Sequence, residues 1–279
     1  MVLGIAQDAG YPQIGCSKIC CAQVKEGKQA AAFPVSWAVM DSATHQWYLI
    51  EASPNIKEQL DYFQKATGNF FNYYPDGIFL THAHMGHYTG LMQLGREAAN
   101  TKDIPVYCLP KMAQFLRNNG PWSQLVQLNN IKIQTLTADS STQIKSNLTA
   151  TAFTVPHRDE YSETAAFIIG NSNKKYLFVP DTDKWSLWKT PLVSYLKQVN
   201  IAFLDATFLS STELPNRNIN EIPHPLVPET IGLLQQEPSL KTKIVLIHFN
   251  HTNPLIWNEE QRKKYSSKYV GIASVGAVY

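Results

Sequence analysis

The sequence places three histidines within six residues, directly after the short apolar run 77–80. In an extended segment, residues i and i+2 point to the same side, so His82 and His84 can bind one metal ion together. His87 follows the predicted strand end, where the chain turns towards a predicted helix, and from there it can face a second ion. Imidazole is the commonest metal ligand among side chains, because its neutral form offers a lone pair. The segment therefore predicts a metal site at the end of a β-strand.

Two further histidines end other apolar, strand-like runs. His157 follows the run 150–156, and His248 follows the run 243–247. The chain has eight histidines in all, and chance packing gives no reason for them to recur at strand ends. We therefore favour a metal site over surface or core histidines gathered by chance.

Composition predicts a single globular domain over residues 1–279. Apolar residues make up 44% of the chain, which is enough for a substantial core, and no linker, charge block or low-complexity segment divides it. The net charge of +2 and the scattered basic residues give no basic stripe, so we expect no nucleic-acid partner. No apolar stretch is long enough to cross a bilayer, and the chain as written has no signal peptide. We expect a cytoplasmic protein, or a periplasmic or secreted one if a leader has been removed.

Short apolar runs alternate with helical patterns along the chain. We expect strands near 1–7, 34–41, 46–52, 77–82 and 105–109, and a second set near 131–137, 149–156, 164–170, 174–180, 201–205 and 243–249. Helical patterns cover 55–66, 90–99, 111–118, 185–198 and 227–235. Because each helix lies between strands, we predict an α/β fold in which helices cover the outer faces of two packed sheets.

Asp181 ends another strand-like run, at 176–181. It is either the cap of a helix that starts near Asp183 or a metal ligand, and beside the strand-end histidines we favour the ligand. With Asp181 included, the chain resembles the metallo-β-lactamase superfamily, whose signature is H-x-H-x-D-H followed by a distant His, a distant Asp and a final His. The matching residues span most of the chain: His82, His84, His87, His157, Asp181 and His248. The resemblance implies an αββα sandwich of two mixed sheets flanked by helices, with the metals at one edge.

The resemblance also implies a role for each matching residue. A first metal ion would be held by His82, His84 and His157. A second would be held by His87 and His248, with Asp181 bridging the two ions.

Gly86 stands where the family signature has aspartate. The second site would therefore lack a carboxylate and would bind its metal more weakly, or not at all. Asp159 or Glu160 could substitute for the missing ligand, and the sequence does not decide this. The three remaining residues form a facial triad that suits non-haem Fe(II) as well as zinc: His87, Asp181 and His248.

Three of the four cysteines cluster near the start of the chain, with C-x3-C-C spacing. This spacing suits a metal better than disulfides within the cluster, and buried free thiols are the alternative. Segments 3–13, 205–208 and 248–254 resemble the pyrroloquinoline-quinone biosynthesis protein B family. A related phosphodiesterase of phosphonate breakdown carries a structural zinc on three N-terminal cysteines and a histidine three residues past the final metal-binding histidine. The resemblance implies such a zinc on Cys16, Cys20, Cys21 and His251, whereas Cys108 is expected to be an ordinary buried thiol.

The quinone biosynthesis family usually lacks the first two motif histidines, which this chain keeps, so we expect a more complete hydrolase site. We predict a metal-dependent hydrolase in which metal-bound hydroxide attacks a small-molecule ester or phosphoester, with phosphodiesters and lactones as the leading classes. Asp181 belongs to this catalytic set, and Asp205 is a candidate to orient a metal-ligating histidine. His224 is either a general acid, a phosphoryl ligand, or a loop histidine between two prolines.

The expected cofactors are one or two catalytic zinc ions, with manganese or iron as alternatives at the second site, and one structural zinc. The alternative functions are an Fe(II) oxygenase that uses the facial triad and a metal-binding module without catalysis. A homodimer is a state that the sequence leaves open.

Overall fold

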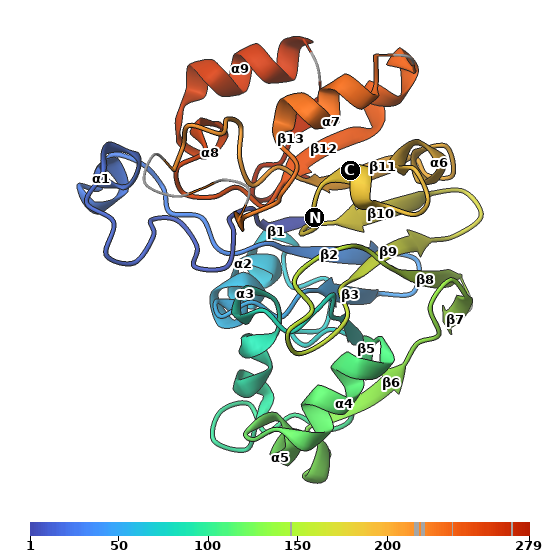
Figure 1. Ribbon diagram of the computed structural model, residues 1–279. Helices are drawn as coiled ribbons and strands as arrows, with labels where there is room; N and C mark the ends of the chain where they lie inside the picture. Colours follow the sequence, from blue (N-terminus) through green and yellow to red (C-terminus); the bar gives the residue numbers. More distant parts are fainter. Residues whose placement is uncertain (146, 215–217, 219–220, 236, 269) are drawn as a thin grey trace.

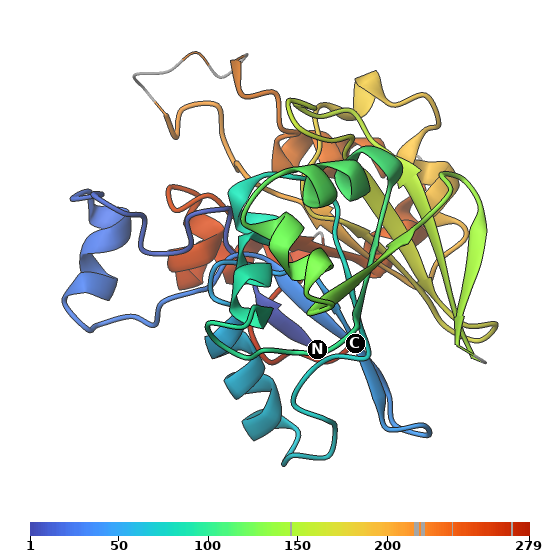
Figure 2. The same ribbon diagram turned by 90° about the horizontal axis from the view of Figure 1, so that it is seen from below.

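Two β-sheets pack face to face in the computed structural model, and helices cover their outer faces (Figures 1 and 2). The structure describes residues 1–145, 147–214, 218, 221–235, 237–268 and 270–279. This arrangement confirms the predicted αββα sandwich of two mixed sheets.

The first sheet has six strands in sequential order, from β1 to β6. They are β1 (Val2–Gly4), β2 (Ser36–Asp41), β3 (Gln46–Ile50), β4 (Gly77–Phe79), β5 (Ile104–Cys108) and β6 (Ile131–Thr135). β1 to β3 pair antiparallel, whereas β3 to β6 run parallel. All three residues of β4 are buried, because parallel strands are covered on both faces.

The second sheet has seven strands in the order β13-β12-β11-β10-β9-β8-β7. They are β7 (Ser141–Lys145), β8 (Leu148–Thr154), β9 (Ala165–Gly170), β10 (Lys175–Val179), β11 (Ile201–Asp205), β12 (Ile244–Ile247) and β13 (Gly271–Ile272). β8 and β10 are both antiparallel to β9, and β10, β11 and β12 are parallel neighbours. The carboxyl ends of β8, β10, β11 and β12 therefore lie at the same edge of the sheet.

Helices fall into two groups, one on each side of the sandwich (Figure 1). On the side of the first sheet lie α2 (Ile56–Ala66), α3 (Met85–Tyr88), the 3-10 helix η1 (Thr89–Leu94), α4 (Pro110–Asn118) and α5 (Trp122–Gln127). On the side of the second sheet lie α6 (Leu192–Leu196), α7 (Val227–Leu233), α8 (Pro254–Trp257) and α9 (Glu259–Lys268). In α2, the buried residues Ile56, Leu60 and Phe63 recur at helical spacing, which gives the helix one apolar face to pack inward. The short α1 (Ile19–Lys25) projects from one side of the sandwich (Figures 1 and 2).

Two predicted helices are wrong in extent. Residues 185–198 form the 3-10 helix η2 (Trp185–Leu187) and then α6, because Pro191 lacks an amide hydrogen and disfavours helical backbone before it. Residues 90–99 contribute to η1, which ends before Gly95, rather than to a longer α-helix. The other predicted helices and strands correspond to observed elements within a few residues. The elements outside the predicted ranges are α1, α3, α5, α8, α9, β7, β13 and the 3-10 helix η4 (Pro238–Lys243).

The core between the sheets is aromatic. Trp37 of β2 packs on Phe178 of β10 and Phe203 of β11, with ring centroids 5.9 and 4.7 Å apart. None of the three is more than 2% exposed. Burial of a phenylalanine side chain contributes about 1.5–3 kcal/mol, so these rings help to fix the two sheets against each other.

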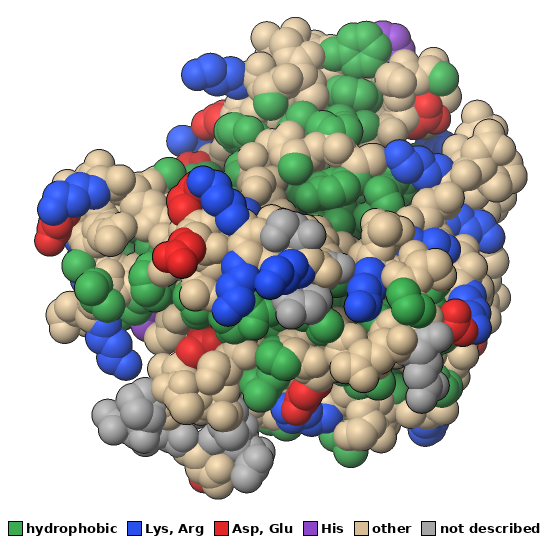
Figure 3. All heavy atoms as spheres, turned by 90° about the horizontal axis from the view of Figure 1, so that it is seen from above, with side chains coloured by type: hydrophobic (Ala, Val, Ile, Leu, Met, Phe, Trp, Pro, Cys, Tyr) green, Lys and Arg blue, Asp and Glu red, His purple; other side chains and the backbone are tan. Residues whose placement is uncertain are grey.

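The outer surface carries mixed charge. On the face with α7 and α9, basic side chains are interspersed with acidic, apolar and other side chains (Figure 3). Within the part of the chain that the structure describes, no helix is both long enough and apolar enough to cross a membrane.

Candidate metal centre

The carboxyl ends of strands from both sheets bring the predicted site residues together. His82 follows β4, His157 follows β8, Asp181 follows β10 and His248 follows β12, each within three residues of the strand end. Asp181 is not a helix cap, because the next helix begins at Trp185 with Lys184 as its N-cap residue. The set predicted from distant parts of the sequence therefore converges at one edge of the sandwich.

Four of these side chains form a first group. His84 Nδ1 lies 2.9 Å from His82 Nε2 and 3.1 Å from His157 Nε2. Asp181 Oδ2 lies 3.4 Å from His82 Nε2 and 3.3 Å from His157 Nε2. Ligand atoms of a tetrahedral zinc ion, at 2.0–2.1 Å from the metal, stand about 3.3–3.4 Å from one another. The first group therefore has nearly the spacing that a zinc ion requires.

A second group faces the other side of Asp181. Asp181 Oδ2 is 3.7 Å from His87 Nε2 and 3.9 Å from His248 Nε2. Asp8, which the sequence analysis did not single out, places Oδ1 3.3 Å from His87 Nε2. Asp8, His87 and His248 each offer a ligand atom, and these atoms lie within 4.8 Å of one another. Asp181 therefore stands where one carboxylate can serve both groups.

Neither acid suggested as a replacement for the motif aspartate joins the second group. Asp159 accepts a hydrogen bond from Thr164 at 3.1 Å, and Glu160 contacts the outer side of the first group. The space beside Gly86 holds Asp8, whose Oδ1 accepts a hydrogen bond from the Gly86 amide at 3.2 Å. Asp8 thus brings a carboxylate to the second group from a distant loop, a residue that the sequence-based alternatives did not include.

Each of the five clustered histidines turns one ring nitrogen inward and the other towards a polar partner. These partners are Thr81 Oγ1 for His82 at 2.8 Å, Glu160 Oε2 for His84 at 3.0 Å, Glu51 Oε1 for His87 at 3.3 Å, Asp183 Oδ1 for His157 at 3.2 Å and Thr207 Oγ1 for His248 at 3.0 Å. Metal-binding histidines are commonly held in this way, because the outer contact fixes the ring orientation and the tautomer. Packing histidines have no need of such paired contacts.

Several inward atoms are buried without a hydrogen-bond partner. They include Nε2 of His87 and Nε2 of His248. A buried polar atom left unpaired costs about 1–3 kcal/mol, so this arrangement is unfavourable for a purely structural cluster. A divalent cation would satisfy these atoms, and the donor set of imidazoles and carboxylates suits zinc, manganese or iron. The residues present therefore fit a metal centre.

Burial and mutual charge shift the pKa values in the cluster strongly. Burial lowers the pKa of His248 to about 4, and it also holds the pKa of His82 well below the usual range. Burial opposes charge on His157 as well, but the Asp181 carboxylate outweighs it and raises the pKa of His157 to about 10. Burial disfavours the charged form of Asp181, yet the surrounding histidines hold its pKa well below the usual range. The Asp181 carboxylate therefore stays ionised and can pair with a cation.

Two site residues adopt left-handed backbone, which is uncommon for residues with a side chain. Glu51 has φ 67° and follows β3, and His248 has φ 66° and follows β12. Glu51 is fully buried, accepts a hydrogen bond from Thr81 and faces His87. Such strained residues occur often at functional sites. Sequence reasoning missed Glu51, although an acid directly after an apolar strand is the same signal that identified Asp181.

His224 and Asp205 form a buried pair beside the cluster. Asp205 Oδ2 lies 2.8 Å from His224 Nδ1, and Thr207 Oγ1 donates to Asp205 Oδ1 at 2.8 Å. Because Thr207 Oγ1 also lies 3.0 Å from His248 Nδ1, Asp205 reaches a clustered histidine through Thr207 rather than directly. Burial opposes charge on His224, but Asp205 and Asp181 outweigh it and raise its pKa. His224 is therefore a held, buried residue rather than a free loop histidine.

The three N-terminal cysteines and His251 form a separate cluster. Cys20 Sγ lies 3.8 Å from Cys16 Sγ and 3.9 Å from Cys21 Sγ, and His251 Nδ1 lies 3.6 and 3.4 Å from the Sγ atoms of Cys20 and Cys21. With Zn–S bonds of about 2.3 Å, tetrahedral geometry places sulfur atoms about 3.8 Å apart. All four cysteines are free, and burial raises the pKa of Cys20 to about 12. The cluster fits a closed zinc site in which all three cysteines contribute.

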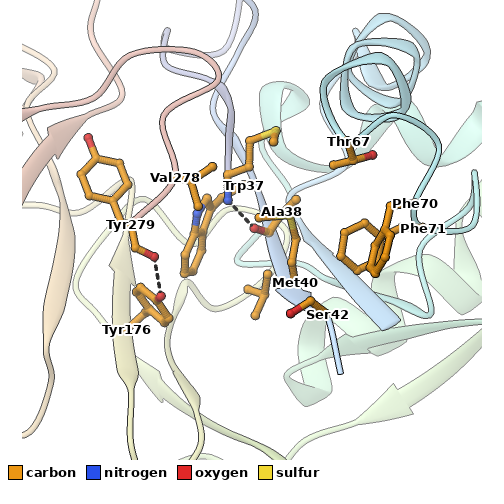
Figure 4. Close-up of a pocket in the computed structure, with 12 residues that line it drawn as sticks. Trp37, Ala38, Met40, Ser42, Thr67, Phe70, Phe71, Tyr176, Val278 and Tyr279 are labelled. Atoms are coloured by element: carbon orange, nitrogen blue, oxygen red, sulfur yellow. Dashed lines mark hydrogen bonds between the residues drawn. The ribbon is translucent and has the colours of Figure 1, made fainter. Parts of the chain in front are cut away.

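A pocket of about 330 Å³ opens beside the centre and is lined mainly by polar residues, among them Asp8, Arg158, His224 and Asn250. Another cavity, of about 450 Å³, is lined by aromatic and apolar residues that include Trp37, Phe70, Tyr176 and Tyr279 (Figure 4). No residue of the metal centre lines this second cavity. The polar pocket is therefore the candidate substrate site.

The comparisons with known proteins agree with this geometry. The model of the family described as "Beta-lactamase superfamily domain" matches residues 46–249. A coenzyme PQQ synthesis protein B from Klebsiella pneumoniae is 25% identical over 97% of this chain and 94% of its own length. The protein of the same name from Pseudomonas putida is 26% identical over 99% of this chain and 97% of its own length.

Solved structures share the fold over the whole chain. Zn(2+)-bound PqqB from Methylobacterium extorquens superposes with a TM-score of 0.78 at 20% identity, covering 99% of this chain and 97% of that one. A diphosphatase from the PhnP family superposes with a TM-score of 0.69 at 18% identity, covering 99% and 95%.

Proposed function

The chain belongs to the metallo-β-lactamase superfamily, and we propose that it is a metal-dependent hydrolase of small-molecule esters, with phosphoesters as the favoured substrates. The observation that carries the proposal is the paired orientation of the clustered histidines, each with one nitrogen aimed at a common centre and the other held. Beside this centre lies a polar pocket that can admit a substrate.

In this proposal His82, His84, His157 and Asp181 hold one metal ion, and His87 and His248 hold a second that shares Asp181. A bound zinc-class ion lowers the pKa of water towards neutrality and so supplies a nucleophile for ester or phosphoester cleavage. Glu51, Glu160 and Asp183 lie beside the outer nitrogens of His87, His84 and His157 and help to fix the orientation of these rings.

His224 is proposed as the general acid. Its Nδ1 is held by Asp205, which leaves Nε2 for the substrate in the pocket that His224 lines. Asp205 and Asp181 raise its pKa, which favours the protonated ring that a general acid needs. Cleavage breaks the bond between phosphorus or the acyl carbon and the leaving oxygen, and that oxygen takes the His224 proton. General acids of this kind contribute about 10²–10⁴-fold to rate.

The pocket offers an arginine and a histidine to an anionic substrate, beside the acids Asp8 and Glu221. Arg158 lines the pocket, and its guanidinium is more than half exposed, with Glu160 3.3 Å away. Together with a protonated His224, it can attract and orient phosphoryl oxygens. A neutral lactone gains less from these groups, so phosphodiesters are the first substrates to test.

An Fe(II) oxygenase is the second candidate. It is favoured by the two histidines and one carboxylate of the second group, a donor set that suits non-haem Fe(II). The complete three-histidine first group beside it favours the hydrolase.

The test is hydrolysis of bis-p-nitrophenyl phosphate, p-nitrophenyl esters and a lactone panel by zinc- or manganese-loaded protein. We expect phosphodiester cleavage, and His224→Gln should lower kcat about 10²–10⁴-fold with unchanged metal content. Tyr176→Phe, in the cavity of Figure 4, is the matched control and should leave kcat unchanged. Full metal content without cleavage of any ester contradicts the proposal, and iron-dependent oxygen consumption selects the oxygenase.

A further inference from the structure

Position 86 requires glycine because there is no room for a side chain, and not because of its backbone conformation. Its φ does not lie in the left-handed region that favours glycine, and it belongs to the short helix α3. A Cβ built on Gly86 would lie 2.4 Å from both Cα and Oδ1 of Asp8. No side chain fits there while Asp8 keeps its place. Two positions 78 residues apart therefore compete for the same volume.

The Asp8 carboxylate fills that volume in the way a ligand would. Its Oδ1 lies 3.3 Å from His87 Nε2, an atom that is otherwise buried without a hydrogen-bond partner. The Asp8 side chain is only 24% exposed and borders the polar pocket. Burial disfavours its charged form, but contact with His87 outweighs this and keeps the pKa of Asp8 far below its usual range. The carboxylate is therefore charged and faces the centre.

The backbone around Asp8 ties it to the strand end that carries His248. Phe249, the next residue, donates its amide to Ile5 at 2.8 Å and accepts from the Gln7 amide at 2.9 Å. Asp8 and His248 are thus each one residue from a paired backbone segment. This pairing holds the two side chains in place before any metal arrives, which limits the entropy lost on binding.

We propose that Asp8 is the terminal carboxylate ligand of the second metal ion, transposed from position 86 of the motif to the N-terminal loop. The second site then has two histidines, His87 and His248, one terminal carboxylate and a share of Asp181. This set of four protein ligands suits zinc or manganese and needs no contribution from Asp159 or Glu160. The inference rests on the proposed metal chemistry, but concerns only which carboxylate completes the second site.

Substitutions at positions 8 and 86 test the proposal. Four chains are compared with the unaltered one: Asp8→Asn, Asp8→Gly, Gly86→Asp and the double variant Asp8→Gly/Gly86→Asp. Metal content is measured after dialysis, and zinc dissociation constants are measured by competition with a chelator. Asp159→Asn is the matched control, because this acid lies near the centre but pairs with Thr164.

We expect Asp8→Asn and Asp8→Gly to retain one ion fewer per chain after dialysis. The dissociation constant of the second ion should be at least about 100-fold higher, because loss of an outer contact to a ligating histidine already lowers metal affinity 10–100-fold. Gly86→Asp should also lower the metal content or the yield of folded protein, because the new side chain meets Asp8. The double variant should not recover the ion, because a Cβ at position 86 would still meet the Cα of position 8 at 2.4 Å. Asp159→Asn should bind as the unaltered chain does.

The proposal is overturned if Asp8→Asn binds the second ion as tightly as the unaltered chain, or if Asp159→Asn loses the ion as Asp8→Asn does. Because Asp8→Asn keeps the shape of the side chain, poor folding of Gly86→Asp does not prevent a decision. The readout uses no substrate. A chain that binds metal as expected but hydrolyses nothing would contradict the proposed function and leave this inference standing.

Discussion

Glu51→Gln should weaken metal binding while leaving the fold intact. Glu51 is fully buried, and its Oε1 lies 3.3 Å from His87 Nδ1 and accepts a hydrogen bond from Thr81 Oγ1. Thr81 Oγ1 in turn lies 2.8 Å from His82 Nδ1, so this one carboxylate supports a histidine of each group. The amide of glutamine keeps the shape but loses the charge, and its NH2 group can no longer accept a hydrogen bond.

The magnitude follows from burial. A buried hydrogen bond to a charged group contributes about 1.5–3 kcal/mol, and each 1.4 kcal/mol is tenfold in affinity. We therefore expect the zinc dissociation constant to rise about 10- to 100-fold, in line with other outer contacts of metal-binding histidines.

Glu160→Gln is the matched control. Glu160 lies 3.0 Å from His84 Nε2, but its side chain is 47% exposed, so water can replace the lost contact. This variant should change the dissociation constant by less than about 5-fold. The assay is competition between the folded protein and a chromophoric chelator, with circular dichroism to verify folding. The reasoning is refuted if Glu51→Gln binds zinc normally, or if Glu160→Gln weakens binding more than Glu51→Gln does.

Two further predictions concern the cysteines and pH. With zinc bound, the thiols of Cys16, Cys20 and Cys21 should resist a disulfide reagent, and they should react once a chelator removes the zinc. Cys108 is fully buried and burial raises its pKa to about 12, so it should react only on unfolding. Equal reaction of all four thiols without a chelator would contradict this prediction. In the metal-free chain, Asp181 raises the pKa of His157 to about 10, so below that pH an incoming ion must displace a proton. Apparent zinc affinity should therefore rise about tenfold per pH unit between about pH 6 and 8, and a flat profile in competition titrations would contradict it.

The strand-end ligands were predictable because two signals coincide in the sequence. Apolar runs of strand length identified β4, β8, β10 and β12, and parallel strands bring their carboxyl ends to one edge. The residues that follow these runs, His82, His157, Asp181 and His248, then had to lie near one another. The same logic would have identified Glu51, which follows β3, but the prediction from strand ends rested mainly on histidines.

Asp8 could not be predicted in this way. Its place depends on contacts across the chain: residues 5–7 pair with Phe249, and the loop then passes over Gly86. No local pattern encodes such a long-range approach, and the missing motif aspartate alone could not say which carboxylate replaces it. The prediction of one helix over 185–198 was wrong for a local reason. The apolar spacing suggested a single helix, but Pro191 divides the segment in two.

The most direct test of the metal centre is an anomalous-scattering map from crystals of the zinc-loaded protein, recorded on both sides of the zinc absorption edge. The account predicts one peak among His82, His84, His157 and Asp181, a second among Asp8, His87, His248 and Asp181, and a third among Cys16, Cys20, Cys21 and His251. Zinc-loaded crystals with no peak at the first two positions would contradict it.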